Sequence, residues 1–176
     1  RLGLEIESRL RIVDWLHFDL DFTANDARFR ENAGNGNAVA LAPRLTLSIG
    51  LSVRTHFGLR GSLRFVGITP RPATEDEFLI AQGTCLLDAF LGYRWRFVEL
   101  SISVENLLNQ RYKQAQFATT SRLPSQPPTS APPPPSACPS GTRVQTSDSG
   151  NFIGCQDVNF TPGYPLNARF TLSLFF

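Results

Sequence analysis

Acidic side chains two residues apart are the first candidates for chemistry in this 176-residue sequence. Asp19 and Asp21 form one such pair, and Glu5 and Glu7 form another. Two carboxyl groups on one face of a strand could act together in hydrolysis or hold a cation. A water-exposed wall would also use such acids, in ion pairs with the basic residues Arg9, Arg60, Arg64 and Arg94. We favour ion pairs over catalysis, and we do not expect an enzyme.

The other reactive residue types are sparse and scattered. His17 and His56 are the only histidines in the sequence, and no Cys or carboxylate cluster accompanies them at metal-ligand spacing. No Ser/His/Asp or Cys/His arrangement and no phosphate-binding loop is recognisable. We therefore predict no catalytic residue, no bound metal and no cofactor. The net charge of only +2, without a basic cluster, also argues against a nucleic-acid partner.

Three cysteines, Cys85, Cys138 and Cys155, fit no zinc-binding spacing. Cys138 and Cys155 are the candidates for a disulfide, because both lie in one long segment between strands, and this would leave Cys85 free. Three free thiols remain an alternative, since sequence spacing cannot show that two Cα atoms come within about 7 Å.

Strict alternation of apolar and polar residues dominates the rest of the sequence, and it places every second side chain on one face of a β-strand. The alternation occurs in seven runs, at residues 2–10, 16–24, 45–54, 57–65, 87–95, 98–105 and 168–176. In the fourth run, for example, Leu59, Leu63 and Phe65 alternate with polar residues. The sequence contains no run of about 18 apolar residues, which a transmembrane helix would require. The sequence therefore predicts an all-β fold.

The links between the runs alternate in length. Short links fall at about residues 11–14, 55–56 and 96–97, and long links fall at about 27–43, 69–83 and 107–165. Outer-membrane barrels have short periplasmic turns and long external loops, whereas a soluble sandwich has no reason for this asymmetry. We predict an antiparallel up-and-down wall of a transmembrane β-barrel, with about seven strands. Proline excludes residues 123–141 from strand interiors, so we expect a Pro-rich external insertion at about 113–161.

The last two runs carry a recognisable motif. The sixth run leads into Val104-Glu105-Asn106-Leu107-Leu108-Asn109-Gln110-Arg111-Tyr112, and Pro162-Gly163-Tyr164-Pro165 precedes the seventh. This pattern resembles the C-terminal end of TonB-dependent outer-membrane receptors, and its key positions are Val104, Asn106, Leu107, Asn109 and Tyr112. By the same resemblance, the alternating Phe170, Leu172, Leu174 and Phe176 are the signal for the barrel assembly machinery.

The resemblance implies a barrel of about 22 strands whose lumen is closed by an N-terminal plug. Residues 1–176 would be the C-terminal part of such a barrel, without its plug, and we expect a longer precursor. The implied function is TonB-dependent uptake of a scarce nutrient, such as an iron siderophore, cobalamin or an oligosaccharide, in the outer membrane of a Gram-negative bacterium. The implied partners are outer-membrane lipid, the plug, TonB, the assembly machinery and the nutrient. A barrel that acts as a channel, adhesion or structural module is the alternative.

Overall fold

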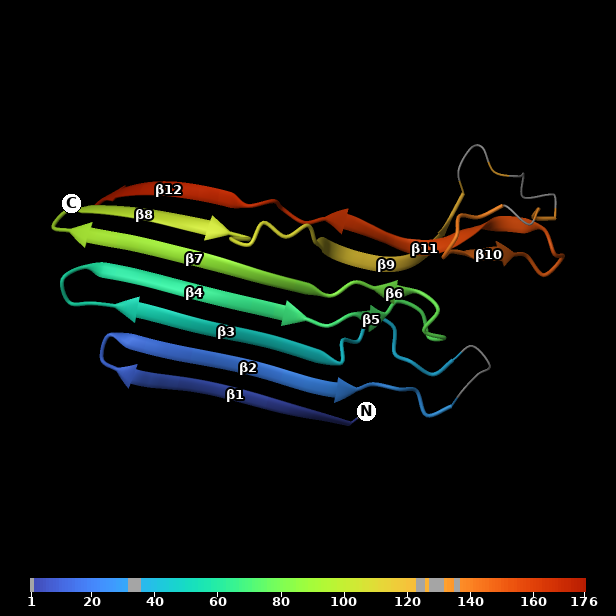
Figure 1. The fold of residues 1–176 in the computed structure, drawn as a ribbon, viewed down its shortest axis with the longest axis horizontal. Helices are drawn as coiled ribbons and strands as arrows, with labels where there is room; N and C mark the ends of the chain where they lie inside the picture. Colours follow the sequence, from blue (N-terminus) through green and yellow to red (C-terminus); the bar gives the residue numbers. More distant parts are fainter. Residues whose placement is uncertain (1, 32–35, 123–125, 127–131, 135–136) are drawn as a thin grey trace.

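The computed structural model describes residues 2–31, 36–122, 126, 132–134 and 137–176, and it is built of β-strands (Figure 1). The strands are β1 (Leu2–Val13), β2 (Leu16–Asp26), β3 (Leu45–Arg54), β4 (Leu59–Ile68), β5 (Arg71–Pro72), β6 (Ile80–Ala81), β7 (Thr84–Trp95), β8 (Val98–Glu105), β9 (Lys113–Ser121), β10 (Arg143–Thr146), β11 (Phe152–Pro162) and β12 (Asn167–Leu174). Within the described residues, no helix is long and apolar enough to cross a membrane.

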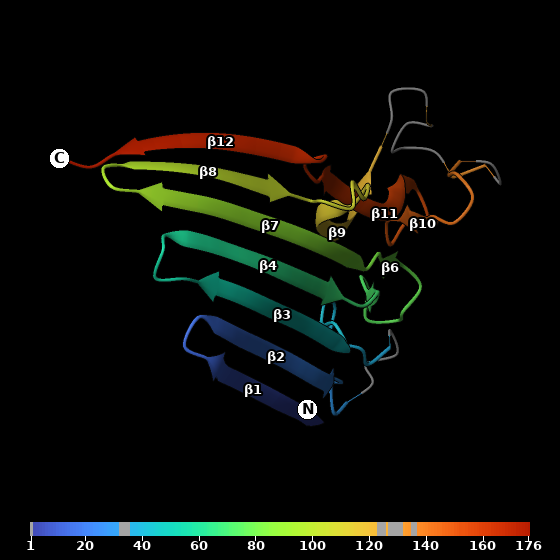
Figure 2. The ribbon, with the colours of Figure 1, turned by 60° about the vertical axis from the view of Figure 1, so that its left-hand side comes forward.

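Seven strands form one antiparallel sheet in the order β1-β2-β3-β4-β7-β8-β12. Each strand pairs with the next strand of this series in the sequence, which is the predicted up-and-down arrangement. The two outermost strands, β1 and β12, lie at opposite edges, and the sheet is not closed within the described residues (Figures 1 and 2). The predicted all-β fold with a seven-stranded antiparallel wall is confirmed.

The register of the sheet places apolar residues beside apolar residues. Phe18 lies opposite Leu51, which lies opposite Leu63 on the next strand. At the far edge, Ile102 lies opposite Phe170. Directly opposite residues of an antiparallel pair project from the same face. The apolar faces of the seven strands therefore merge into one continuous surface.

Several strand ends differ from the predicted runs. β2 and β4 extend to Asp26 and Ile68, and β7 begins at Thr84. β1 continues to Val13, because a register shift between Arg11 and Val13 lets the strand pair almost to its turn. Phe57 lies in a turn before β4, where Gly58 has a φ of 96° and therefore reverses the chain. Phe176 lies beyond β12, which ends at Leu174.

Short and long links lie at opposite ends of the sheet. The β1–β2, β3–β4 and β7–β8 turns lie at the left end of Figure 1, together with the C-terminus. The described residues of the long links, within 27–44, 69–83 and 106–166, lie at the right end, as does the N-terminal end of the chain. The alternation of link lengths in the sequence thus gives the sheet one end with short turns and one end with long links.

The longest link covers residues 113–161, for which the sequence predicts a Pro-rich external insertion. It contains a second antiparallel sheet, in the order β10-β11-β9. The β9 sequence Lys-Gln-Ala-Gln-Phe-Ala-Thr-Thr-Ser lacks strict apolar alternation, and pairing with β11 supplies its order instead. In the described part of residues 123–141, no strand is present, as the prolines predict.

Buried side chains lie mainly outside the seven-stranded sheet. Ala73, Leu79 and Ala81 form one small core in the β4–β7 link, and Ala118 and Val158 of the second sheet pack against it. The 27–44 link joins the same layer, because the Leu41 N–H donates to the Pro72 carbonyl at 2.7 Å. The three long links therefore pack together as one structured layer beyond the ends of the large sheet.

Candidate functional site

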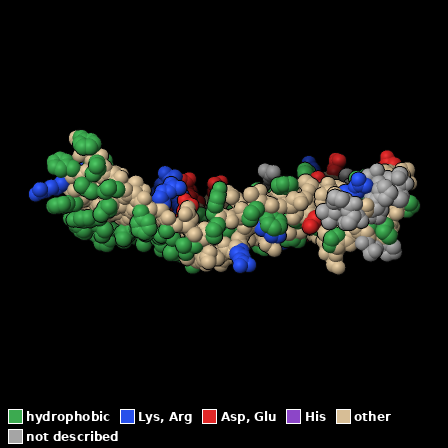
Figure 3. All heavy atoms as spheres, turned by 90° about the horizontal axis from the view of Figure 1, so that it is seen from above, with side chains coloured by type: hydrophobic (Ala, Val, Ile, Leu, Met, Phe, Trp, Pro, Cys, Tyr) green, Lys and Arg blue, Asp and Glu red, His purple; other side chains and the backbone are tan. Residues whose placement is uncertain are grey.

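The apolar face of the large sheet is exposed. Leu100, Phe170 and Leu172 are 61%, 79% and 62% exposed, although they lie within regular strands. Hydrophobic side chains gather along the lower side of the left half in Figure 3, and charged side chains gather on the opposite side. An exposed apolar face of this extent marks a surface that meets a partner or a membrane.

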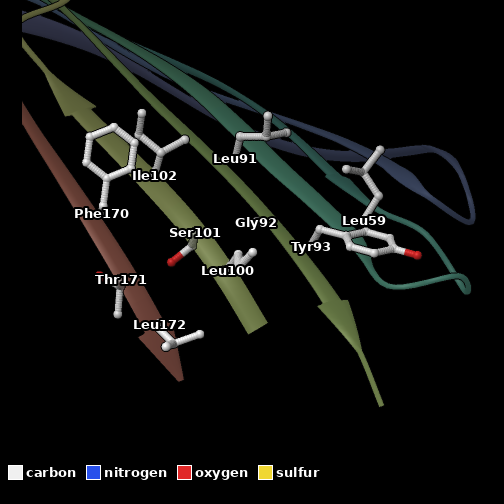
Figure 4. A pocket seen from close by; sticks show the side chains of 10 residues that line it. All are labelled: Leu59, Leu91, Gly92, Tyr93, Leu100, Ser101, Ile102, Phe170, Thr171 and Leu172. Atoms are coloured by element: carbon white, nitrogen blue, oxygen red, sulfur yellow. The ribbon is translucent and has the colours of Figure 1, made fainter. Parts of the chain in front are cut away.

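Part of this face is an open groove across β4, β7, β8 and β12 (Figure 4). Its apolar lining comes from paired positions, since Tyr93, Leu100 and Leu172 lie side by side, as do Leu91 and Ile102. Among these side chains, Tyr93 also carries a polar hydroxyl group. Such a surface can hold hydrocarbon, and no Asp, Glu, His, Cys, Lys or Arg is among the described residues that line it.

The opposite face carries ion pairs. Arg60 pairs with Glu99, and the Arg64 Nη2 atom lies 3.8 Å from the Asp19 Oδ2 atom. Asp19 leans over Gly50, where an added Cβ would collide with the carboxylate. The glycine therefore makes room for a charged side chain on this face.

The structure forms only some of the ion pairs that the sequence predicted. Arg9 contacts Glu7 at 2.8 Å, but Arg94 stacks 3.9 Å above the centroid of the Phe175 ring. His17 lies in β2 and His56 in the β3–β4 turn. In the part of the chain that the structure describes, no group of three or more His, Cys, Asp or Glu side chains is arranged to hold a metal ion.

Aromatic residues surround the short-turn end. Tyr93, Trp95 and Phe97 flank the β7–β8 turn and are 47%, 62% and 69% exposed. The Phe175 N–H donates to the Phe97 carbonyl at 2.8 Å, which ties the segment after β12 to that turn. Tyr and Trp side chains at this level suit the boundary between hydrocarbon and water.

The terminal residues singled out in the sequence share the apolar face. Phe170, Leu172 and Leu174 project from β12, opposite Ile102, Leu100 and Val98 of β8. Phe176, beyond the strand, is fully exposed. The geometry places these side chains where another protein can reach them, and their role as an assembly signal stays a prediction.

The Val104–Tyr112 motif forms the junction between β8 and β9. Asn106 is 3% exposed and has a φ of 52°, a backbone conformation that asparagine tolerates better than most residues. Its Nδ2 atom donates to the Gln110 carbonyl at 2.9 Å and to the Tyr164 carbonyl at 3.0 Å. Its Oδ1 atom accepts from the Gln110 N–H at 2.9 Å. This side chain therefore closes the turn and ties it to the segment before β12.

The other motif residues complete the junction. Asn109 also has a positive φ, 47°, and its Oδ1 atom accepts from the Leu166 N–H at 3.2 Å. Leu107 donates its N–H to the Leu87 carbonyl at 2.7 Å. The Tyr112 carbonyl accepts from the Gly163 N–H at 2.8 Å. A Cβ at Gly163 would collide with the Tyr112 ring, so the Pro-Gly sequence allows this close approach.

The junction separates two paired stretches of one long hairpin. β8 pairs with β12, and beyond the junction β9 pairs with β11. The β8–β9 side has seven residues at 106–112, and the β11–β12 side has four at 163–166. The extra residues are accommodated in the Asn106 turn. The motif thus marks the point where the hairpin leaves the large sheet, a role that the sequence alone did not reveal.

The second sheet is held by a disulfide and by one buried glutamine. Cys138 and Cys155 are bridged, with Cα atoms 5.6 Å apart, beside the fully buried Phe152. Gln116, which is 4% exposed, accepts from the Gln82 N–H at 2.7 Å and donates to the Gln82 carbonyl at 2.9 Å. The bridge is the pair expected from the sequence, whereas the Gln116 contact has no sequence signal.

Asp76 ties the β5–β6 hairpin to β10. The Thr74 hydroxyl donates to its carboxylate at 2.7 Å, the Phe78 N–H donates at 3.2 Å, and Arg143 forms an ion pair with it. The Thr74 hydrogen bond first, and then the interactions with Arg143 and Phe78, lower the pKa of Asp76 from 3.8 to about 2. The carboxylate therefore stays charged in all but strongly acidic conditions.

The sequence matches no known family model, and no curated protein matches it significantly. Two solved structures share its fold over 99% of the chain. The first is the ferric yersiniabactin uptake receptor FyuA from Yersinia pestis, with a TM-score of 0.63 and 18% identity. The second is the ferric-catecholate import receptor Fiu from E. coli K12, with a TM-score of 0.64 and 15% identity.

The chain has the fold of a segment of a TonB-dependent receptor barrel. It spans 23% of the length of FyuA and 20% of the length of Fiu. The first protein is named as an uptake receptor and the second as an import receptor.

Proposed function

We propose that this chain is the C-terminal part of the β-barrel of a TonB-dependent receptor in the outer membrane of a Gram-negative bacterium. The continuous apolar face across seven strands carries the proposal. The gathering of the long links at one end of those strands supports it. In hydrocarbon, backbone groups must pair within the protein, so such a sheet is stable there only as part of a closed barrel. The apolar face meets lipid, and the charged face lines the lumen.

In this proposal, the structured layer of long links lies outside the cell and the short turns lie in the periplasm. The exposed aromatic residues beside the β7–β8 turn, Tyr93, Trp95 and Phe97, then lie at the periplasmic boundary of the membrane. The same orientation places the Cys138–Cys155 disulfide in an oxidising environment. Link length, aromatic position and disulfide position thus support the same orientation.

The parent protein imports a scarce nutrient, and a ferric siderophore is the first class to test, because both structural neighbours are named as receptors for ferric ligands. The plug, TonB and the barrel assembly machinery are the proposed protein partners. The Val104–Tyr112 junction supports transport indirectly, because it positions the external hairpin relative to the wall.

Epitope insertion tests the orientation in the full-length protein on intact cells. An epitope at Ser149, in the exposed β10–β11 link, should be labelled by antibody without permeabilisation. The matched epitope between Asp14 and Trp15, in the β1–β2 turn, should be labelled only after the outer membrane is opened. Labelling of both sites on intact cells would contradict a membrane-spanning wall.

Growth tests the transport function. Cells that depend on a ferric siderophore should grow with the full-length protein and an intact TonB, and they should not grow when either is removed. Growth that is independent of TonB would favour a passive channel. Growth that is independent of the protein would remove the assignment to that nutrient.

A further inference from the structure

A second groove lies on the apolar face, near the long-link end of the sheet. It has a volume of about 540 Å³, which falls within the range of about 300–1,000 Å³ that is typical of small-molecule sites. Phe22, Leu45 and Leu47 from β2 and β3 line one side, and Cys85 from β7 lines the other. The groove is open outward, and its lining is predominantly apolar.

The groove exists because β4 has a glycine on its apolar face. Gly67 lies directly between Leu47 of β3 and Cys85 of β7. The missing side chain leaves a depression, and Gly83, which directly precedes β7, also lines it. Phe65, two residues earlier on the same face, leans toward it, with its Cε1 atom 3.2 Å from where a Cβ of residue 67 would lie.

The end of the groove nearest the long links is polar. Thr69 and Pro70 close it there, and Gln110 contributes an exposed side chain from the β8–β9 junction. Asn106 holds the backbone of Gln110 at both its N–H and its carbonyl. Arg111, the next residue, is exposed. The groove therefore runs from apolar side chains to a polar end with a fixed backbone.

We propose that this groove holds one acyl chain of a lipid from the outer leaflet, with the polar head of the lipid at Gln110. This inference rests on the proposed function, because it requires the apolar face to lie in hydrocarbon. The groove is continuous with that face, and its polar end lies at the long-link end, where the outer headgroups would be. A flexible chain can fill a depression that the rigid strands leave open, which restores van der Waals contact with Leu47, Phe65 and Cys85.

A side chain that fills the groove should prevent the lipid from binding there. We expect the full-length Gly67→Leu protein to retain one lipid fewer than the wild type when it is released from nanodiscs in a native mass spectrometer. Gly67 does not have a left-handed φ, and the added side chain meets only the movable Phe65 ring. The matched control is Gly61→Leu, on the same strand and face but outside the groove, where the nearest atoms are 3.5 Å and 3.7 Å from an added Cβ. Equal lipid retention by both variants would overturn the proposal.

A fluorescent label separates the failure of this inference from failure of the membrane assignment. Leu63→Cys, at the centre of the apolar face, is labelled with bimane in a Cys85→Ser background and exposed to brominated lipids or to aqueous iodide. Quenching by lipid together with equal lipid retention overturns the groove site and leaves the membrane assignment standing. Quenching by iodide alone overturns both. Quenching by lipid together with the loss of one lipid in Gly67→Leu supports both.

Discussion

Replacing Asn106 by alanine should lower the free energy of unfolding by about 4 kcal/mol. The side chain makes three hydrogen bonds at 2.9–3.0 Å, two with Gln110 and one with the Tyr164 carbonyl. Each contributes about 1 kcal/mol, and because Asn106 is 3% exposed, water cannot replace them readily. The φ of 52° adds about 1 kcal/mol for alanine, which tolerates this conformation less well than asparagine.

Asn109→Ala is the matched control. Asn109 has nearly the same backbone conformation, with a φ of 47°, but its side chain makes one hydrogen bond, with the Leu166 N–H at 3.2 Å, in an exposed position. We expect that substitution to cost about 2 kcal/mol, from one hydrogen bond and the backbone strain. The difference of about 2 kcal/mol isolates the two additional hydrogen bonds of Asn106.

The measurement is urea unfolding of the full-length protein in lipid vesicles, followed by tryptophan fluorescence. Hydrogen exchange at the Gln110 amide gives a local readout, because the Asn106 Oδ1 atom accepts from that N–H. Faster exchange there in Asn106→Ala than in Asn109→Ala is expected. If the two variants were equally stable, or if Asn106→Ala lay within 1 kcal/mol of the wild type, the reasoning about this junction would be refuted.

Three further predictions concern the large sheet and the layer of long links. Leu63→Arg should make the free energy of membrane insertion less favourable by roughly 2–4 kcal/mol, because it places a charge on the apolar face, which the proposed function assigns to lipid. Ser62→Arg, on the charged face, should insert nearly normally. Equal folded yields in vesicles would count against the register. Cys138→Ala should lower the stability of the second sheet by about 3 kcal/mol, measured by denaturant-dependent proteolysis, and peptide mapping without reduction should detect the bridge in the wild type. Asp76 has a lowered pKa, so its stabilising contribution is fully present above pH 3.8 and is lost as the pH falls through about 2; hydrogen exchange in the β5–β6 hairpin should accelerate over that window, and Asp76→Asn should abolish the pH dependence.

The sequence predicted the large sheet well because period-two alternation is a local record of the two faces of a strand. Leu63 and Ser62, neighbours in the chain, project to opposite faces as their types indicate. Link lengths then predicted that the short turns lie at one end of the sheet and the long links at the other, since these lengths depend only on where the runs begin and end. The prediction that Phe57 belongs to a strand was wrong, because the alternation continues by chance into the turn at Gly58.

Tertiary structure alone decided the order of the layer of long links and the role of the motif. β9 carries no clear alternation, so it became a strand only by pairing with β11, some 40 residues away, as the pair of Phe117 and Asn159 shows. Gln116 finds its partner in Gln82, and Asn106 finds one in Tyr164, across 34 and 58 residues. A polar side chain can bond to any donor or acceptor that comes within reach. Its type thus limits the kind of partner, but only the folded chain determines which partner is present.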